Sequence, residues 1–159
     1  MNRKSRAAWV GIFLLLAVAN YVPSARAAHC SLATTAGKYG FTLTGTLILP
    51  TVAVPIAAVG KAVLDASGNA SGTESRSVGG GFADETLAGT YAVNTDCTGT
   101  ATIQFFESGQ LVRTSILSLV VDDNHREIRM VQKSLQLPNG AFLPVVVTVE
   151  ARRISKEED

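Results

Sequence analysis

The sequence predicts an all-β fold, a single antiparallel up-and-down barrel of about eight strands. Three observations lead to this fold class. Alternating or continuous apolar runs recur at strand length, short clusters rich in Gly, Asn and Asp separate them, and hardly any helical pattern follows residue 28. Closing consecutive strands into a barrel removes exposed sheet edges, which favours a barrel over the alternative, a β-sandwich.

The first predicted strand, 39–49, alternates apolar side chains with threonines, and it places Tyr39 and Phe41 on the face expected to be buried. Two prolines remove hydrogen-bond donors from 50–55, so this segment is expected to be a loop or an irregular edge. The second strand is predicted to follow directly, at 56–65.

The third predicted strand, 70–78, is rich in Ser and Thr, so we expect it to lie exposed at a sheet edge. The three glycines of 79–81 are the most flexible point after residue 28 and predict a loose connection. They lead into a fourth strand at 86–95, in which Leu87 and Tyr91 share one face.

Four further strands complete the predicted barrel, and Asn, Asp and Gly clusters separate them. The strongest hairpin signal in the chain is Pro138-Asn139-Gly140, which precedes the last strand. These strands are predicted at 100–107, 110–121, 126–137 and 141–154.

The strand at 110–121 carries apolar residues on both faces, which indicates packing against another layer or subunit. A homo-oligomer is therefore one predicted assembly. On this strand Val112, Ile116 and Val120 oppose Leu111, Leu117, Leu119 and Val121.

Residues 1–27 have the pattern of a cleavable secretory signal: a basic start, an apolar run over 7–19, and Ala25-Arg26-Ala27 before the expected cut. We expect its removal to leave 28–159 as one exported domain, secreted or periplasmic, with no transmembrane anchor. Because four basic residues and no acidic one precede the cut, the remaining chain would carry a net charge of −3, which disfavours nucleic acid as a partner.

Cys30 and Cys97 are the two cysteines of the chain, and an oxidising compartment favours their pairing in a disulfide. The alternative is a lipid-anchored Cys30. Lipoprotein signals place a small residue directly before the cysteine, whereas His29 occupies that position here. The disulfide is therefore the favoured prediction.

The candidate ligand-binding residues are aromatic side chains expected to line an apolar pocket or to fill the core, together with Glu107 and Arg113. Glu107 and Glu150 are the carboxylates most apt to meet an apolar environment that raises a pKa, with water-facing positions as the alternative. Arg113 is expected to pair with such an acid or to extend to solvent. The aromatic set is Tyr39, Phe41, Tyr91, Phe105 and Phe106.

No catalytic residue, cofactor or metal is assigned. His29 and His125 lack obvious partners, and no nucleophile elbow of the Gly-x-Ser-x-Gly type occurs. The acidic turn 122–125 could hold a cation, but it lacks calcium-loop spacing and is also typical of a tight turn. An outer-membrane barrel is disfavoured because aromatic residues make up only 6% of the chain.

Three segments, GKYGF at 37–41, GTYAV at 89–93 and DCTGT at 96–100, resemble a group of small secreted bacterial β-proteins without assigned activity. In strand number and hairpin order the chain is also distantly similar to calycin-like barrels, including the allene oxide cyclase type. This resemblance implies a barrel with an apolar interior, and it carries over no catalytic residue.

The sequence thus predicts an exported, non-enzymatic barrel that binds a small apolar ligand or a partner in the cell envelope. Two alternatives stay open. One is a barrel enzyme of the cyclase or isomerase kind that uses a preshaped apolar cavity and one carboxylate, Glu107 or Glu150. The other is an oligomeric structural protein of the envelope.

Overall fold

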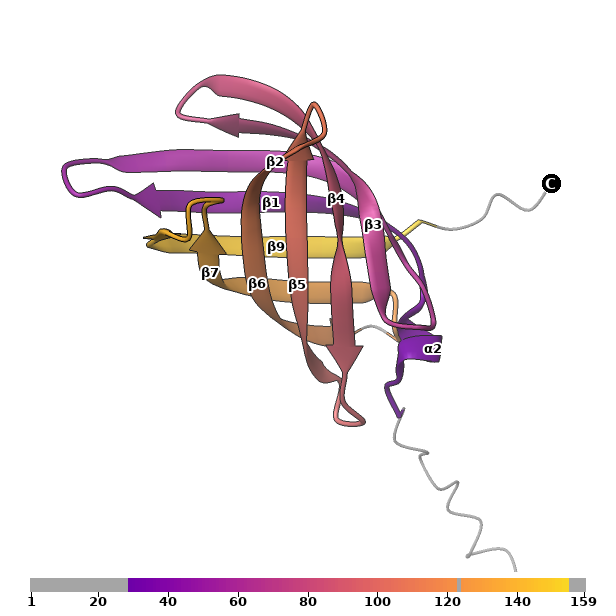
Figure 1. The fold of residues 1–159 in the computed structure, drawn as a ribbon. Coiled ribbons are helices and arrows are strands. Elements are labelled where there is room, and N and C mark those ends of the chain that lie inside the picture. The colour runs from indigo at the N-terminus through magenta and orange to yellow at the C-terminus, as the bar shows by residue number, and fades with distance from the viewer. Residues whose placement is uncertain (1–28, 123, 155–159) are drawn as a thin grey trace, which may run out of the picture.

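The computed structural model describes residues 29–122 and 124–154 (Figure 1). The predicted signal segment, 1–27, lies outside the described residues, as does the charged tail at 156–159. No helix within the described part is long and apolar enough to span a membrane.

The described residues form a closed antiparallel barrel, which confirms the predicted fold class. Each strand from β1 to β7 pairs with the next along the chain, and β9 closes the ring by pairing with both β7 and β1. The elements are α2 (Leu32–Thr35), β1 (Gly37–Ile48), β2 (Ala53–Leu64), β3 (Asn69–Val78), β4 (Gly81–Val93), β5 (Thr98–Glu107), β6 (Gln110–Asp122), β7 (Glu127–Gln136), β8 (Phe142–Leu143) and β9 (Val145–Arg153).

The last predicted strand is divided in the structure. β8 pairs with β7 through Leu135 and Leu143, whereas β9 pairs with β7 from Val131 and Thr148 onward. Pro144 lies between the two pieces, where its missing N–H interrupts the ladder. Its carbonyl still accepts a hydrogen bond of 2.8 Å from the Ile48 N–H.

β3 is not an edge strand, contrary to the prediction. It pairs with β2 along one side and with β4 along the other. Its polar composition has a different cause, because Glu74 points inward and is almost completely buried. A charged side chain is tolerated there because it meets an opposite charge inside the barrel.

The predicted loop at 50–55 was too long, since β2 begins at Ala53 and includes Pro55. The Pro55 carbonyl accepts a hydrogen bond from Gly79, so its missing N–H would face the same side, beyond the last β2–β3 pair. Proline therefore removes at most one hydrogen bond, at the very end of the β2–β3 ladder. Gly79 and Gly80 have φ angles of 55° and 91° and make a tight hairpin turn, rather than the loose connection expected from the glycines.

The inner face of the barrel is apolar over most of its length, as the alternation of the strands predicted. On β6, Leu117, Leu119 and Val121 are buried inside. The opposing Ile116 and Val120 are 39% and 49% exposed, so the described chain does not cover this outer face. The homo-oligomer stays a prediction.

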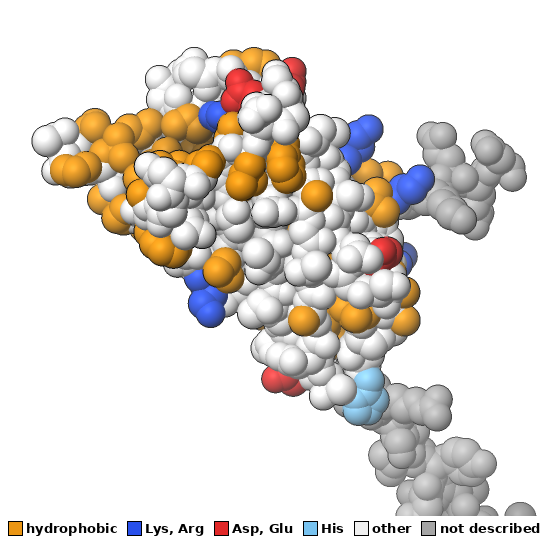
Figure 2. All heavy atoms as spheres, viewed as in Figure 1, with side chains coloured by type: hydrophobic (Ala, Val, Ile, Leu, Met, Phe, Trp, Pro, Cys, Tyr) orange, Lys and Arg blue, Asp and Glu red, His pale blue; other side chains and the backbone are white. Residues whose placement is uncertain are grey.

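A second exposed apolar region lies at the end of the barrel where β1 joins β2. Ile48 and Val52 are exposed there, and the Ile48–Pro144 hydrogen bond brings them beside Phe142 and Val146. Figure 2 shows hydrophobic side chains gathered over this projecting end.

The opposite end of the barrel carries the segment that precedes β1. Cys30 and Cys97 form a disulfide, which confirms the predicted pairing. α2 follows directly and is capped by Ser31, whose side chain accepts a hydrogen bond from the Thr34 N–H. The Tyr39 hydroxyl donates to the Thr35 carbonyl at 2.7 Å, which ties α2 to β1.

Candidate functional site

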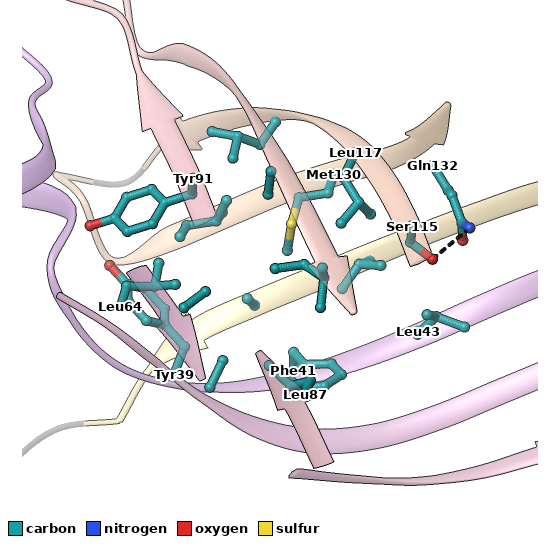
Figure 3. A pocket seen from close by; sticks show the side chains of 18 of the residues that line it. Tyr39, Phe41, Leu43, Leu64, Leu87, Tyr91, Ser115, Leu117, Met130 and Gln132 are labelled. Carbon is teal, nitrogen blue, oxygen red and sulfur yellow. Dashed lines mark hydrogen bonds between the residues drawn. The ribbon is translucent and has the colours of Figure 1, made fainter. Parts of the chain in front are cut away.

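The interior of the barrel holds a cavity of about 90 Å³ whose wall is mostly apolar (Figure 3). Tyr39, Phe41, Tyr91 and Phe105 line it, so four of the predicted aromatic residues come together here. The fifth, Phe106, follows Phe105 on the strand and therefore lies on the other face of β5.

Small side chains keep this space open. Ala62, Ala70, Ala101 and Ala151 line the cavity at positions where larger apolar residues would fill it. An engineered cavity of about 150 Å³ holds benzene, and the pockets that bind drug-sized ligands have volumes of about 300–1,000 Å³. The space therefore suits a molecule of a few heavy atoms, and it is intermediate between a filled core and a wide ligand cavity.

The two tyrosines present apolar ring surface to the cavity, because their hydroxyls are already engaged. Tyr91 donates to the Asp65 carbonyl at 2.6 Å, just as Tyr39 donates to Thr35. Burial raises the pKa of Tyr91, and the Asp65 carboxylate adds to that effect. Both rings therefore serve as wall at the α2 end of the cavity.

The other end of the cavity is polar. Ser115 on β6 and Gln132 on β7 line it, and the Gln132 side-chain amide donates to the Ser115 hydroxyl oxygen at 2.9 Å (Figure 3). Gln132 also donates to the Ser134 carbonyl at 3.1 Å. Glu74 from β3 lines the cavity as well.

A cluster of five charged side chains lies beside this polar end. Arg113 reaches from β6 across the Phe105 ring, 3.8 Å from its centroid, and donates to Glu74 at 2.6 Å and to Glu85 at 2.5 Å. Arg76 bonds Glu85 as well, and it meets Glu107 at 3.4 Å. Glu74 and Glu85 are each only 3% exposed, so the centre of this cluster is removed from water.

Arg113 pairs with acids, as one of its two predicted roles required, but its partners are Glu74 and Glu85. Glu107 sits at the rim, where its side chain is 45% exposed, and it does not line the cavity. Glu150 is exposed on the outer face of β9, opposite Thr42. The water-facing alternative was therefore correct for Glu150.

Sequence reasoning missed Glu74, Glu85, Ser115 and Gln132. The sequence contained a usable signal for Glu74: it lies four residues after Ala70, so both side chains face the same, inner side of β3. An acidic residue at an inward position indicates either an exposed strand or a buried partner. The polar composition of the whole strand favours the first interpretation, whereas the structure shows the second.

Glu74 has unusual chemistry. Its Oε1 atom accepts from Arg113, whereas its buried Oε2 atom has no hydrogen-bond partner among the described residues. Burial raises the pKa of Glu74 above its ordinary value, and the Arg113 guanidinium acts in the opposite direction. The neutral form of Glu74 therefore persists to a higher pH than it would in water.

This raised pKa gives a pH dependence with a definite sign. The folded state holds the Glu74 proton more tightly than the unfolded state, whose pKa is about 4.3. The stabilisation from Glu74 is thus fully present below about pH 4.3 and is lost as pH rises through the folded pKa. We expect Glu74→Gln to remove this loss in urea unfolding measured from pH 4 to 8.

The Glu107→Gln variant is the control for that experiment, because it keeps Glu74 and alters only the rim of the same cluster. It should show the same fall in the free energy of unfolding as the unaltered protein. Identical pH profiles for Glu74→Gln and the unaltered protein would contradict the assignment.

The histidines take no part in this site. His125 lies at the α2 end, with its Nδ1 atom 3.5 Å from the Cys30 sulfur. Asn124 and His125 have φ angles of 52° and 67°, as expected for a tight turn. Within the described residues, no group of three His, Cys, Asp or Glu side chains is placed to hold a metal ion.

No family model and no curated protein matches this chain. A solved structure with the same fold is that of EF1p2_mFAP2b bound to DFHBI. The similarity covers 79% of this chain and 100% of that chain, with a TM-score of 0.55 and 11% sequence identity. At this identity the comparison shows the fold alone.

Proposed function

We propose that this protein is an exported, non-enzymatic barrel that binds one small apolar molecule in its interior. The observation that carries the proposal is the cavity of about 90 Å³, with an almost entirely apolar wall and a few polar groups at one end. Small-molecule sites commonly combine these two features. EF1p2_mFAP2b, which has a similar barrel, is bound to DFHBI.

The disulfide supports the exported location. Disulfides persist in the periplasm and outside the cell, and they are rare in the cytosol, where thiols are kept reduced. The Cys30–Cys97 bond holds the segment before β1 against the β4–β5 turn. Both the barrel fold and this disulfide support the proposed resemblance to small secreted bacterial β-proteins with a calycin-like barrel.

The two ends of the barrel suggest how a ligand enters. The α2 end is held by the disulfide and by the tyrosine hydrogen bonds. At the other end, Glu74 lines the cavity and also borders an open hollow of about 560 Å³ on the outer side of β2, β3 and β4, next to the β5–β6 turn. We therefore expect entry past the charged cluster.

Filling the cavity tests the proposal. Ala101 lines the cavity, so Ala101→Leu adds an isopropyl group to the proposed binding space. We expect the unaltered protein to bind 1-chloropropane, seen as shifts of the methyl resonances of Leu117 and Val149. In Ala101→Leu the affinity should fall about tenfold or more, because the apolar contacts of the ligand are replaced by the leucine.

Ala88→Leu is the matched control, since Ala88 is exposed on the outer face of β4. It should bind 1-chloropropane as the unaltered protein does. The proposal fails if the unaltered protein shows no saturable methyl shifts, or if Ala101→Leu binds as tightly as Ala88→Leu.

The enzyme alternative keeps one supporting observation, which concerns Glu74 rather than the predicted Glu107 or Glu150. Proton transfer inside a barrel requires a carboxyl group that lines the cavity, and Glu74 meets this condition. Its pKa is raised by burial, which is the direction that suits a carboxyl group acting as a general acid or base. This alternative requires turnover that Glu74→Gln abolishes while ligand binding persists.

A further inference from the structure

We infer that the polar end of the cavity selects a compact, uncharged alcohol with a hydrocarbon chain. Its hydroxyl group forms a hydrogen bond with the Oε2 atom of Glu74. The inference rests on the proposed function, because it names the chemical class that the same cavity takes. The same cavity rejects small carboxylates.

Glu74 has unmet hydrogen-bonding capacity. Arg113 occupies Oε1 at 2.6 Å, while Oε2 is buried and has no partner among the described residues. A buried polar atom left unpaired is unfavourable, so a ligand group that bonds it gains affinity there. Because Glu74 lines the cavity, a molecule inside can supply that partner.

A hydroxyl group on the ligand suits Glu74 better than other uncharged polar groups do, because it can both donate and accept a hydrogen bond. A hydroxyl donates to the carboxylate form of Glu74 and accepts from its protonated form, in which Glu85 is the competing acceptor. A ketone or an ether has no hydrogen to donate. Ser115 adds a second contact, since its oxygen accepts from Gln132 and its own O–H is in no hydrogen bond among the described residues.

Ser115 and Glu74 line the same cavity from different strands, β6 and β3. Ser115 and Arg113 are both buried on the inner face of β6, two residues apart. Arg113 in turn binds Glu74. In the proposed complex the alcohol donates its hydrogen to Glu74, Ser115 is the nearest hydroxyl on the β6 side that could donate to the alcohol oxygen, and the hydrocarbon part lies against the apolar lining.

The charges of the cluster decide which ligands the cavity rejects. The cluster contains two guanidinium groups, Arg76 and Arg113, and three carboxylates. Both arginines are already paired with acids, so a ligand carboxylate would be buried beside like charges with no free cation. Such a ligand is rejected by both desolvation and repulsion.

Three probes of similar size test this selection: 1-propanol, 1-chloropropane and propanoate. Their affinities are measured from the methyl shifts of the full chain near pH 7. If the hydroxyl had no partner, its burial would make 1-propanol about tenfold or more weaker than 1-chloropropane. We expect instead that 1-propanol binds at least as tightly as 1-chloropropane, and that propanoate binds at least about tenfold more weakly.

Two variants with the same charge change identify the residue. Glu74→Leu and Glu107→Leu each remove one carboxylate from the cluster and leave two acids facing two arginines. In Glu74→Leu, 1-propanol should become about tenfold weaker relative to 1-chloropropane. In Glu107→Leu the ratio of the two affinities should not change, since Glu107 does not line the cavity.

The outcomes separate the two claims. Binding of 1-chloropropane without any preference for 1-propanol, or tighter binding of propanoate, overturns the hydroxyl selection and leaves the proposed function standing. Failure of all three probes overturns the proposed function itself. If Glu74→Leu does not fold, the ranking of the three probes on the unaltered protein still decides the inference.

Discussion

Replacing Arg113 by methionine is expected to destabilise the barrel by about 3–5 kcal/mol, the usual effect of removing one partner from a buried ion pair. Arg113 is the cation that binds both Glu74 and Glu85, and each of these acids is almost completely buried. Methionine fills much of the same volume, so the loss would come mainly from Glu74, left without a cation, and from Glu85, left with Arg76 alone. Urea unfolding followed by circular dichroism measures it.

Arg129→Met is the matched control. Arg129 also pairs with two acids, Glu127 and Asp122, but its side chain is largely exposed on the outer face. Asp122 is exposed, and the buried Glu127 is also bound by Arg152, so the loss of Arg129 leaves no buried acid without a cation. We therefore expect a loss of only about 0–1 kcal/mol. Equal effects of Arg113→Met and Arg129→Met would show that the cluster is not a buried, mutually dependent unit.

Protonation should reduce the damage from Arg113→Met. Burial raises the pKa of Glu74, and loss of the Arg113 cation removes the influence that holds that pKa down. At pH 4 the acid would therefore be neutral in the variant, and the destabilisation should be smaller than at pH 7. A triple variant that adds Glu74→Gln and Glu85→Gln should recover part of the lost stability at pH 7.

Removing the disulfide is expected to have an effect of similar size, a loss of about 2–5 kcal/mol. Cys30 and Cys97 are 67 residues apart in sequence, so the bond restricts a long loop in the unfolded chain. In the folded state it holds α2 beside β1, where the Tyr39 hydroxyl bonds the Thr35 carbonyl. The Cys30→Ala, Cys97→Ala double variant tests this by urea unfolding.

The unaltered protein unfolded with and without a reducing agent provides the control for that variant. Both comparisons should show the same fall in the midpoint, because both open the same bond. Hydrogen exchange should become faster first at the Tyr39 and Thr35 amides and in β1 next to them. An unchanged midpoint in the double variant would mean that the bond contributes no net stability.

The barrel was predictable because side-chain alternation reports directly on which face is buried. Tyr39 and Phe41 on β1, and Val147 and Val149 on β9, all point inward as their period of two requires. The same rule places Glu150, one residue after Val149, on the outer face. Its exposure could have been predicted from the sequence.

The charged cluster was not predictable in the same way. Glu74, Glu85 and Arg113 lie on β3, β4 and β6, and the curvature of the closed barrel brings them together across Phe105. Local patterns contain no information about such contacts across the interior. The polarity of β3 therefore indicated exposure when its actual cause was a buried ion pair.

The sequence left open whether the interior is filled or hollow, because the cavity volume is the small difference between the space inside the barrel and the volume of the inward side chains. Ala70, Ala101 and Ala151 decide this difference. Each is unremarkable in its own strand, and only the closed geometry shows that they face the same space.

The most direct test of the central claim, an open apolar cavity inside the barrel, is a crystal structure of the protein under xenon pressure. Xenon binds dry apolar cavities and needs no polar partner. We expect xenon inside the barrel, in contact with Phe41, Leu117 and Val149, and no xenon there in Ala101→Leu. A filled interior, with xenon bound only on the outer surface, would contradict the account.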